Sequence, residues 1–242
     1  MKTILIQGAN EREVLAYVNH FKNFDVKTID NYVFYDGEYE DYEVIISVTG
    51  SGVINAAAST MVGIYNFKPD IVINQGTAGA HLPELKIGDI LVGEYAVYIN
   101  KLETSIKSAG EGSNSLEWTP MAKGSNKVPA SEELLALVHK LKCAKKLKFG
   151  IFGTSDIFTR EVDRILYSNS LYGEISEDME SVAVYKTCEN AGVPYIGFRI
   201  ISNNEITDPG RTKEERQAKS SEILPSLAEV VFELIEKFLA QK

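Results

Sequence analysis

The sequence predicts an α/β fold in a single domain, a three-layer α/β/α arrangement around a mostly parallel sheet. Apolar, β-branched runs alternate along the chain with helix-like stretches, as they do in folds with a parallel sheet. Several runs are apolar at consecutive positions, which is typical of strands covered on both faces. No repeat and no linker rich in Pro, Gly or Ser divides the chain, so we expect one domain over residues 1–242.

The elements follow in chain order. Each predicted strand is a short apolar run that ends near Gly, Ser or Asn: residues 3–7, 42–48, 71–74, 90–98, 147–153 and 195–201. The predicted helices lie between or after them: residues 11–21, 53–67, 131–141, 159–167, 181–191 and 221–239. Two polar stretches interrupt this order. We expect residues 101–127 to form a loop that acts as a lid or subunit contact, and residues 203–219 to separate the last strand from the C-terminal helix.

Composition and charge exclude several classes of protein. A formal net charge of −9 at pH 7 argues against a general nucleic-acid binder, which would show a basic patch. No apolar stretch approaches the roughly 20 residues that span a bilayer. The N-terminal apolar run of about five residues is too short for a signal peptide. We therefore expect a cytoplasmic protein with neither nucleic acid nor membrane as a partner.

The cysteines and histidines carry no metal-site or disulfide pattern. Cys143 and Cys188 lie far apart without paired spacing, so they are expected to be free thiols. His20, His81 and His139 are scattered, and no special role is expected for any of them. We expect no metal and no cofactor.

A ligand site is predicted at the strand ends. In open α/β sheets, ligands collect beyond the carboxyl ends of the strands. The segments there are rich in Gly, small hydroxyls or carboxylates: residues 7–13, 49–52, 76–79, 153–159, 177–180 and 202–205. The pattern indicates one site assembled from many strand ends.

Each motif also has an ordinary structural explanation. The acidic residues after Gly8, like those of residues 177–180, could be helix N-terminal charges. The glycines of residues 49–52 allow close approach to a helix N-terminus, but they lack the dinucleotide fingerprint and the P-loop lysine. Arg199 is different, because an arginine inside an apolar strand costs free energy unless a carboxylate or ligand pairs with it.

Taken in order, the motifs resemble the nucleoside phosphorylase superfamily, and within it most of all the methylthioadenosine/S-adenosylhomocysteine nucleosidases. The resemblance rests on GANEREV, KPDIVINQGTAGA with LKIGDI, GTSDIF, DMES and VPYIGFRIIS, and it extends from Met1 to about Asn203. It implies a central mixed, mostly parallel twisted sheet and cleavage of a purine nucleoside's N-glycosidic bond by water, as in methionine salvage. It also implies a homodimer or larger homo-oligomer. The run 90–99 is a candidate contact surface, with burial inside the sheet equally open.

The resemblance assigns roles at the sugar. Glu13 occupies the position of the glutamate that activates water, and Met179 with Glu180 matches the pair that binds ribose. Arg199 matches an arginine that organises the water and the glutamates. Thr77 stands where a serine usually lines the water and ribose site.

The resemblance also assigns roles around the base. Phe158 matches an aromatic residue that stacks on the base, and Thr159 lies where the family offers backbone contacts to it. The family motifs place Ala78, Gly79 and Ser202 among the substrate-binding residues as well.

Three departures put the nucleoside itself in question. Asn203 stands where the family has an aspartate that serves the base, and an amide donates hydrogen bonds but is no general acid. Asn10 and Ser51 replace apolar residues around the 5′ group. Asn204 and Glu205 follow where small residues are usual, and either Asp156 or Glu205 could supply a carboxylate to the base. These changes motivate a 6-oxopurine nucleoside with a polar 5′ group as substrate.

The nucleophile and the class of function have alternatives. Phosphorolysis needs clustered cations, whereas the segment 73–76 has none and Arg12 stands alone near the first loop, so we expect water. A phosphate-dependent purine nucleoside phosphorylase and a non-catalytic nucleoside-binding homologue remain the alternatives. Retention of Glu13, Glu180 and Arg199 together favours catalysis.

Overall fold

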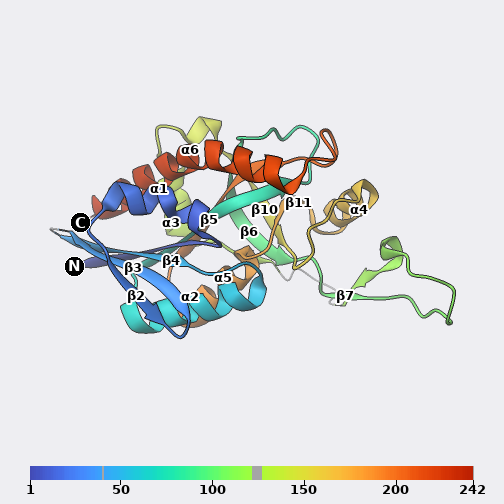
Figure 1. Ribbon diagram of the computed structural model, residues 1–242, viewed down its shortest axis with the longest axis horizontal. Coiled ribbons are helices and arrows are strands. Elements are labelled where there is room, and N and C mark those ends of the chain that lie inside the picture. The colour runs from blue at the N-terminus through green and yellow to red at the C-terminus, as the bar shows by residue number, and fades with distance from the viewer. Residues whose placement is uncertain (40, 122–126, 242) are drawn as a thin grey trace.

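A large sheet runs through the middle of the molecule in the computed structural model, which describes residues 1–39, 41–121 and 127–241, and helices cover both of its faces (Figure 1). One face carries α1 (Glu11–Phe21), α3 (Glu132–Val138) and α6 (Lys213–Leu239). The other carries α2 (Val53–Phe67) and α5 (Ser181–Ala191), while α4 (Val162–Tyr172) lies towards one end. The predicted three-layer α/β/α fold with a mixed, mostly parallel sheet is confirmed.

The strand order is β11-β10-β6-β12-β5-β1-β4-β3-β2, with β9 (Val128–Pro129) paired to β6. β1 (Lys2–Gly8) runs parallel to β4 (Tyr42–Val48) and to β5 (Ile71–Ala80), which is also parallel to β12 (Tyr195–Asn203). β10 (Lys148–Thr154) runs parallel to β6 (Ile90–Tyr98) and β11 (Glu174–Asp178). The carboxyl ends of β1, β5 and β12 therefore meet at one edge, where a ligand site is expected.

An antiparallel pairing between β11 and β5 folds the sheet back on itself. It places Ser176 opposite Ala80 and Glu177 opposite Gly79. On the other side of β5, Asn203 pairs with the same Gly79. Glu177 and Asn203 thus flank one glycine, although they are 26 residues apart in the sequence.

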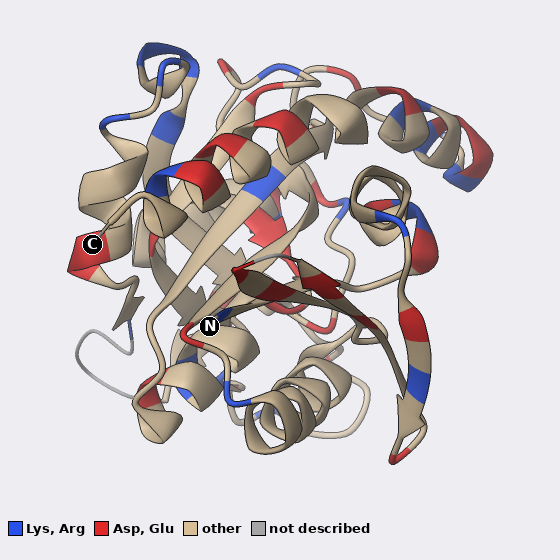
Figure 2. Ribbon diagram, turned by 90° about the vertical axis from the view of Figure 1, so that its left-hand side faces the viewer, with Lys and Arg blue, Asp and Glu red and all other residues tan. Residues whose placement is uncertain are grey.

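The core is continuous through both helical layers. Strand residues such as Ile4, Ile73 and Ile200 are fully buried, and they pack with helix residues such as Leu227 and Val184. Residues 90–99 were expected to form either a contact surface or a strand buried in the sheet, and Leu91, Val92 and Ala96 favour the second because they have no exposed area. Lys and Arg are scattered among Asp and Glu over the molecule (Figure 2). No described helix is long and apolar enough to cross a membrane.

Several boundaries differ from the sequence prediction. The hairpin of β2 (Asp25–Ile29) and β3 (Tyr32–Tyr39) and strand β11 were not predicted. β5 continues to Ala80, and α4 begins at Val162 rather than at residue 159. α6 begins at Lys213 rather than at residue 221, because Thr212 and Glu215 form a capping box.

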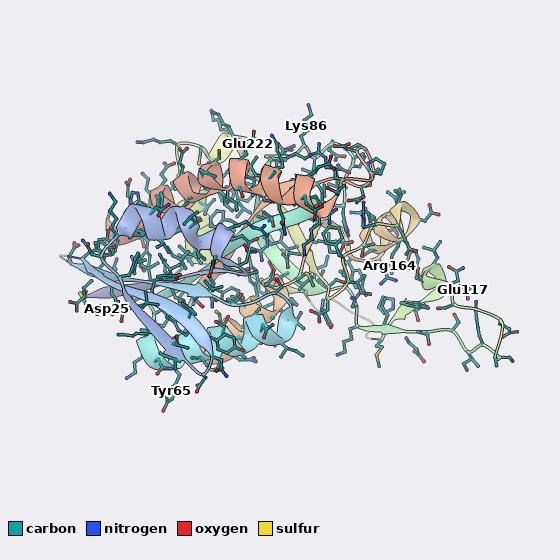
Figure 3. The ribbon with its side chains drawn as sticks, in the orientation of Figure 1. Asp25, Tyr65, Lys86, Glu117, Arg164 and Glu222 are labelled. Carbon is teal, nitrogen blue, oxygen red and sulfur yellow. The ribbon has the colours of Figure 1, made fainter. Side chains whose placement is uncertain are left out.

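Within the predicted loop 101–127, residues 101–121 form an arm that extends away from the sheet (Figure 1). Its described part contains a two-stranded ladder, β7 (Leu102–Glu103) with β8 (Thr119–Pro120), and a short 3₁₀ turn at Ser115–Glu117. Arg164 of α4 faces the arm (Figure 3), and its guanidinium carbon lies 5.1 Å from the centroid of the Trp118 ring. Residues 122–126, which complete the predicted loop, lie outside the described residues.

Candidate active site

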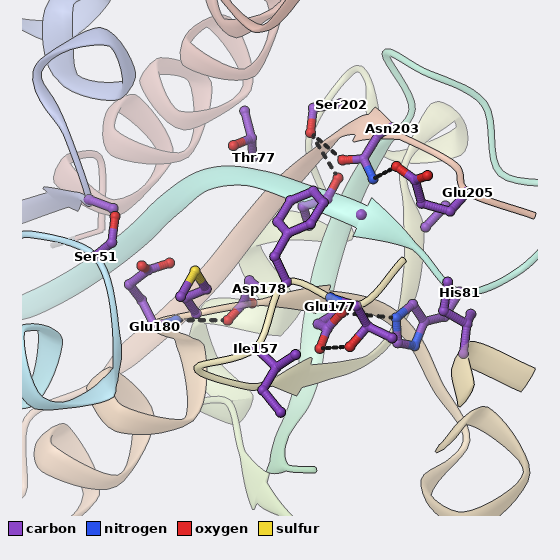
Figure 4. Close-up of a pocket in the computed structure, with 18 of the residues that line it drawn as sticks. Ser51, Thr77, His81, Ile157, Glu177, Asp178, Glu180, Ser202, Asn203 and Glu205 are labelled. Atoms are coloured by element: carbon purple, nitrogen blue, oxygen red, sulfur yellow. Dashed lines mark hydrogen bonds and ion pairs between the residues drawn. The ribbon is translucent and has the colours of Figure 1, made fainter. Parts of the chain in front are cut away.

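A cavity of about 140 Å³ opens at the carboxyl ends of β1, β5, β11 and β12 (Figure 4). It is lined by Ala9, Asn10, Glu13, Ser51, Thr77, Ala78, Gly79, Ala80, His81, Ile157, Phe158, Thr159, Ile165, Glu177, Asp178, Met179, Glu180, Ser202, Asn203 and Glu205. The structure therefore brings all the predicted site residues except Arg199 to one cavity. Its wall contains five carboxylates and, among the described lining residues, neither Lys nor Arg.

Glu13 is fixed by hydrogen bonds from both sides. Its Oε2 accepts from the Ala9 amide at 2.8 Å, and its Oε1 accepts from the Thr77 amide and hydroxyl, each at 3.0 Å. The side chain is only 6% exposed. Donors fixed in this way hold the carboxylate in one orientation at the cavity wall.

Gly76 gives the Glu13 carboxylate its room. A Cβ at position 76 would lie 3.0 Å from the carboxyl carbon and from both oxygens of Glu13. The glycine in the motif IVINQGTAG thus has a packing reason, because any larger residue would displace the carboxylate.

Glu180 faces the same cavity from the start of α5. Its Oε1 accepts from the Gly52 amide at 3.1 Å, and Gly52 has φ +95°, which favours glycine. Burial is the main reason why the pKa of Glu180 rises to about 8, and the neighbouring Asp178 raises it further against the opposing charge of Arg199. A ligand that donates hydrogen bonds to this carboxylate would favour its ionised form.

Asp178 is the centre of the turn that carries Met179 and Glu180. Its Oδ1 accepts from the amides of Glu180 and Ser181 and from the Thr154 hydroxyl at 2.9–3.0 Å. Its Oδ2 accepts from the Ser181 hydroxyl at 2.5 Å and from Arg199. Sequence reasoning did not single out this residue, although it stands in the DMES motif.

Arg199 lies behind the cavity wall and is 1% exposed. Its Nε donates to Asp178 Oδ2 at 3.1 Å and its Nη2 to Asn74 Oδ1 at 2.6 Å. The expectation that Arg199 helps to organise the water and the glutamates stays a prediction. Arg199 is placed to act through Asp178 and the turn.

The side of the cavity that is expected to hold the 5′ group presents polar side chains. Asn10 begins α1 and Ser51 precedes α2, and both line the cavity. The Asn10 Oδ1 is buried without a hydrogen-bond partner, so it is a free acceptor beside the cavity. Met179 is partly buried and lines the same cavity.

Asn203 and Glu205 lie together at the other end of the cavity (Figure 4). Asn203 Oδ1 accepts from the Ser202 hydroxyl at 3.0 Å, and its Nδ2 faces Glu205 Oε1 at 3.4 Å. Gly79 adjoins this amide, since a Cβ there would lie 3.2 Å from Asn203 Nδ2. Of the two carboxylates considered for the base, Glu205 is in the cavity, whereas Asp156 accepts from the Val53 amide at 3.0 Å and lines no part of it.

Phe158 and Thr159 form the remaining wall. Phe158 is 49% exposed, and the Arg216 guanidinium lies over its ring, 4.7 Å from the ring centroid. Thr159 donates its amide and its hydroxyl to Glu177, at 3.3 and 2.9 Å. The Thr159 N–H is thus already bonded, so the carbonyl is the backbone group left for the expected contact with the base.

His81 is the functional candidate that the sequence did not indicate. It lines the cavity, is 2% exposed, and lies between two carboxylates, with Nδ1 3.0 Å from Glu174 and Nε2 3.5 Å from Glu177. Burial alone would lower the pKa of His81, but the two glutamates outweigh it and raise the pKa to about 9. The described residues contain no group of three or more side chains that could hold a metal ion.

Comparison with known proteins places this geometry in a family. A family model described as the phosphorylase superfamily matches residues 3–236. The chain is 30% identical over 201 residues to the 5′-methylthioadenosine/S-adenosylhomocysteine nucleosidase of Buchnera aphidicola subsp. Schizaphis graminum, covering 82% of each chain.

Solved structures share the fold. A futalosine hydrolase mutant of Helicobacter pylori superimposes with a TM-score of 0.83 at 23% identity, covering 98% of this chain and 100% of the other. The methylthioadenosine/S-adenosylhomocysteine nucleosidase of Helicobacter pylori, solved with a bound pyrrolidine compound, gives a TM-score of 0.82 at 22% identity and covers 98% of both chains.

Proposed function

Because the chain belongs to the phosphorylase superfamily, we propose that it hydrolyses the N-glycosidic bond of a purine nucleoside with water as the nucleophile. One observation carries this proposal: Glu13 and Glu180 present two buried carboxylates to one cavity whose described lining residues include neither Lys nor Arg. Such a site suits a sugar that gains positive charge and a water molecule that loses a proton.

Glu13 is the proposed general base. It takes a proton from water as the water oxygen bonds to C1′, and the base departs with the electrons of the broken C–N bond. Thr77 holds the carboxylate with two hydrogen bonds to Oε1, which leaves Oε2 with only the Ala9 amide. Oε2 is therefore the oxygen with acceptor capacity left for water.

Glu180 is the proposed ribose ligand. Its carboxylate receives one backbone hydrogen bond, from Gly52, and can accept further ones from the 2′- and 3′-hydroxyls. Positive charge developing on the sugar favours the ionised form of a carboxyl group whose pKa is raised to about 8 in the free enzyme. Met179 packs beside it, and Arg199 positions both through Asp178.

Phosphate is disfavoured as the nucleophile. A phosphate dianion would meet Glu13, Glu177, Asp178, Glu180 and Glu205, while Arg199 is already bonded to Asp178 and Asn74 behind the wall. Binding of phosphate in proteins generally uses Arg or Lys, or backbone N–H groups at a helix N-terminus. The acidic wall therefore supports hydrolysis rather than phosphorolysis.

We further propose a preference for a 6-oxopurine with a polar 5′ group. A 6-oxopurine can leave with negative charge shared by its 6-oxygen and ring nitrogens, and the Asn203 amide can donate to that edge. Asn10 Oδ1 and Ser51 offer polar contacts at the 5′ side. We also propose that residues 1–242 act as one domain within a homodimer or larger homo-oligomer.

A nucleoside panel tests the proposal. Inosine, methylthioadenosine, S-adenosylhomocysteine and futalosine are incubated with the enzyme in phosphate-free buffer, and free base and free sugar are measured. Release of base and sugar from inosine or futalosine faster than from methylthioadenosine is the expected result. A clear preference for methylthioadenosine would reject the substrate shift. Binding without any release would indicate a non-catalytic nucleoside-binding protein.

A further inference from the structure

The proposed reaction gives the departing base a hydrogen bond from Asn203, and a proton donated to the base would lower the barrier further. Asn203 stands where an acid would be useful, and an amide cannot supply a proton. At the same end of the cavity the structure holds a histidine that no step of the proposed mechanism uses.

His81 is positioned by β5. Residues 77, 79 and 81 alternate along this strand and its end, so they follow one another on one face. Thr77 donates a hydrogen bond to Glu13, the proposed base for water, and Gly79 adjoins Asn203. His81 continues this row away from the water, and the base would lie over Gly79, where no side chain takes up space.

We infer that His81 is the general acid that protonates the purine base as it leaves. The imidazolium gives the proton on Nε2 to the ring nitrogen that faces β11, as that base takes the electrons of the C–N bond. Water supplies hydroxide to C1′ and one proton to Glu13. That proton passes to solvent and His81 is recharged from solvent, so the products are the neutral base and the free sugar.

The contacts of His81 fit this role, which rests on the proposed function. Nδ1 is held by Glu174 at 3.0 Å, and this fixes the ring. Nε2 lies 3.5 Å from Glu177 Oε2, beyond a good hydrogen bond, and both Glu177 oxygens already accept from Thr159. The proton on Nε2 is therefore close to a carboxylate but free to move to a ligand.

The surroundings keep His81 charged at neutral pH. Glu174 and Glu177 of β11 face the ring, and Arg164, Tyr167 and Tyr172 of α4 line the small cavity on its other side. Glu174 Oε2 is buried without a hydrogen-bond partner, so its charge acts mainly on the histidine. The resulting pKa of about 9 lets His81 hold a proton below that pH and lose it above.

Comparing two substrates distinguishes a catalytic role of His81 from a structural one. His81→Gln is expected to lower kcat on the best purine nucleoside on the order of 100-fold, the usual size of a general-acid effect. It should change kcat on 4-nitrophenyl β-D-ribofuranoside less than about threefold, because that leaving group departs without a proton. His139→Gln, at an exposed histidine stacked on Phe149, is the matched control.

A pH profile provides the second readout. Wild-type kcat/KM should fall above pH 9, which gives the profile an alkaline limb. In His81→Gln, kcat/KM should show no such fall. Glu174→Gln should move the limb to lower pH by about one unit, because one carboxylate that holds the charge is lost. This profile also decides the question if the riboside is not turned over or if His81→Gln does not fold.

The outcomes are distinct. Equal losses on both substrates, no loss on the nucleoside, or an alkaline limb unchanged in Glu174→Gln would overturn the role of His81. A wild-type enzyme that cleaves no nucleoside would instead reject the proposed function itself.

Discussion

The guanidinium of Arg199 is joined to the carboxylate of Asp178, with Nε 3.1 Å from Oδ2, in a pair that is 1% and 0% exposed. Asp178 Oδ1 in turn accepts from the Glu180 amide. A charge behind the cavity wall therefore sets the position of the proposed ribose ligand through the backbone.

Removing the positive charge of this pair should destabilise the protein. Arg199→Met leaves Asp178 buried without its counter-charge, which typically costs about 3–5 kcal/mol of unfolding free energy. For a chain of this size, a fall in Tm of roughly 10 °C is expected by circular dichroism. Arg12→Met, at an exposed residue, is the control. A change of under about 2 °C in Arg199→Met would show that the pair contributes little.

Glu13 should affect the chemical step more than binding. Glu13→Gln keeps the size of the side chain but removes the base, so kcat should fall about 10³-fold while KM changes only a few-fold. Glu11→Gln, at an exposed residue two positions earlier in α1, should behave as wild type. If Glu13→Gln retained more than about a tenth of the activity, another group would have to activate the water.

The raised pKa of Glu180 has a consequence for stability. The folded protein keeps this carboxyl group protonated up to about pH 8, whereas the unfolded chain releases the proton near pH 4.5, the ordinary pKa of a glutamate. The stabilisation is present at low pH and is lost as the pH rises from about 4.5 through 8.

Between pH 5 and pH 8, the Tm of the ligand-free wild type should therefore fall more than that of Glu180→Gln. His81 acts in the same direction at somewhat higher pH, and it is unchanged in this comparison. Equal falls in the two proteins, measured by scanning calorimetry, would show that Glu180 is ionised in the folded state at neutral pH.

Asn203 is the residue expected to select the base. Asn203→Asp introduces a carboxyl group that can protonate or hydrogen-bond a 6-aminopurine, so kcat/KM on adenine nucleosides should rise, by about tenfold or more, relative to inosine. The measurement is the ratio of adenine to hypoxanthine release. No gain on adenine nucleosides would remove Asn203 from the specificity account.

The sequence was informative where function requires short local motifs. The segments ending at Gly76–Gly79, Met179–Glu180 and Ser202–Asn203 carry their residue types at fixed spacing, and strand ends bring them to one edge. The Glu174–His81–Glu177 cluster could not be found in this way. Its members meet only through the antiparallel pairing of β11 with β5, which joins segments far apart in the chain.

The missed elements have similar physical causes. β2 is exposed along almost its whole length, so it shows no buried-face pattern. The first turns of α6 are polar, so they also show no buried-face pattern. Thr212 and Glu215 could nevertheless have marked the start of α6 as a capping box. Asp178 was overlooked as an organising residue because two of the five hydrogen bonds to its carboxylate come from Thr154 and Arg199, which other strands supply.

The identity of the sugar product tests hydrolysis most directly. The preferred nucleoside is cleaved without phosphate and with a roughly 50-fold excess of phosphate over substrate. Chromatography then distinguishes free ribose from ribose 1-phosphate among the products. Hydrolysis predicts free sugar in both reactions at the same rate. Formation of ribose 1-phosphate, or cleavage only when phosphate is present, would contradict it.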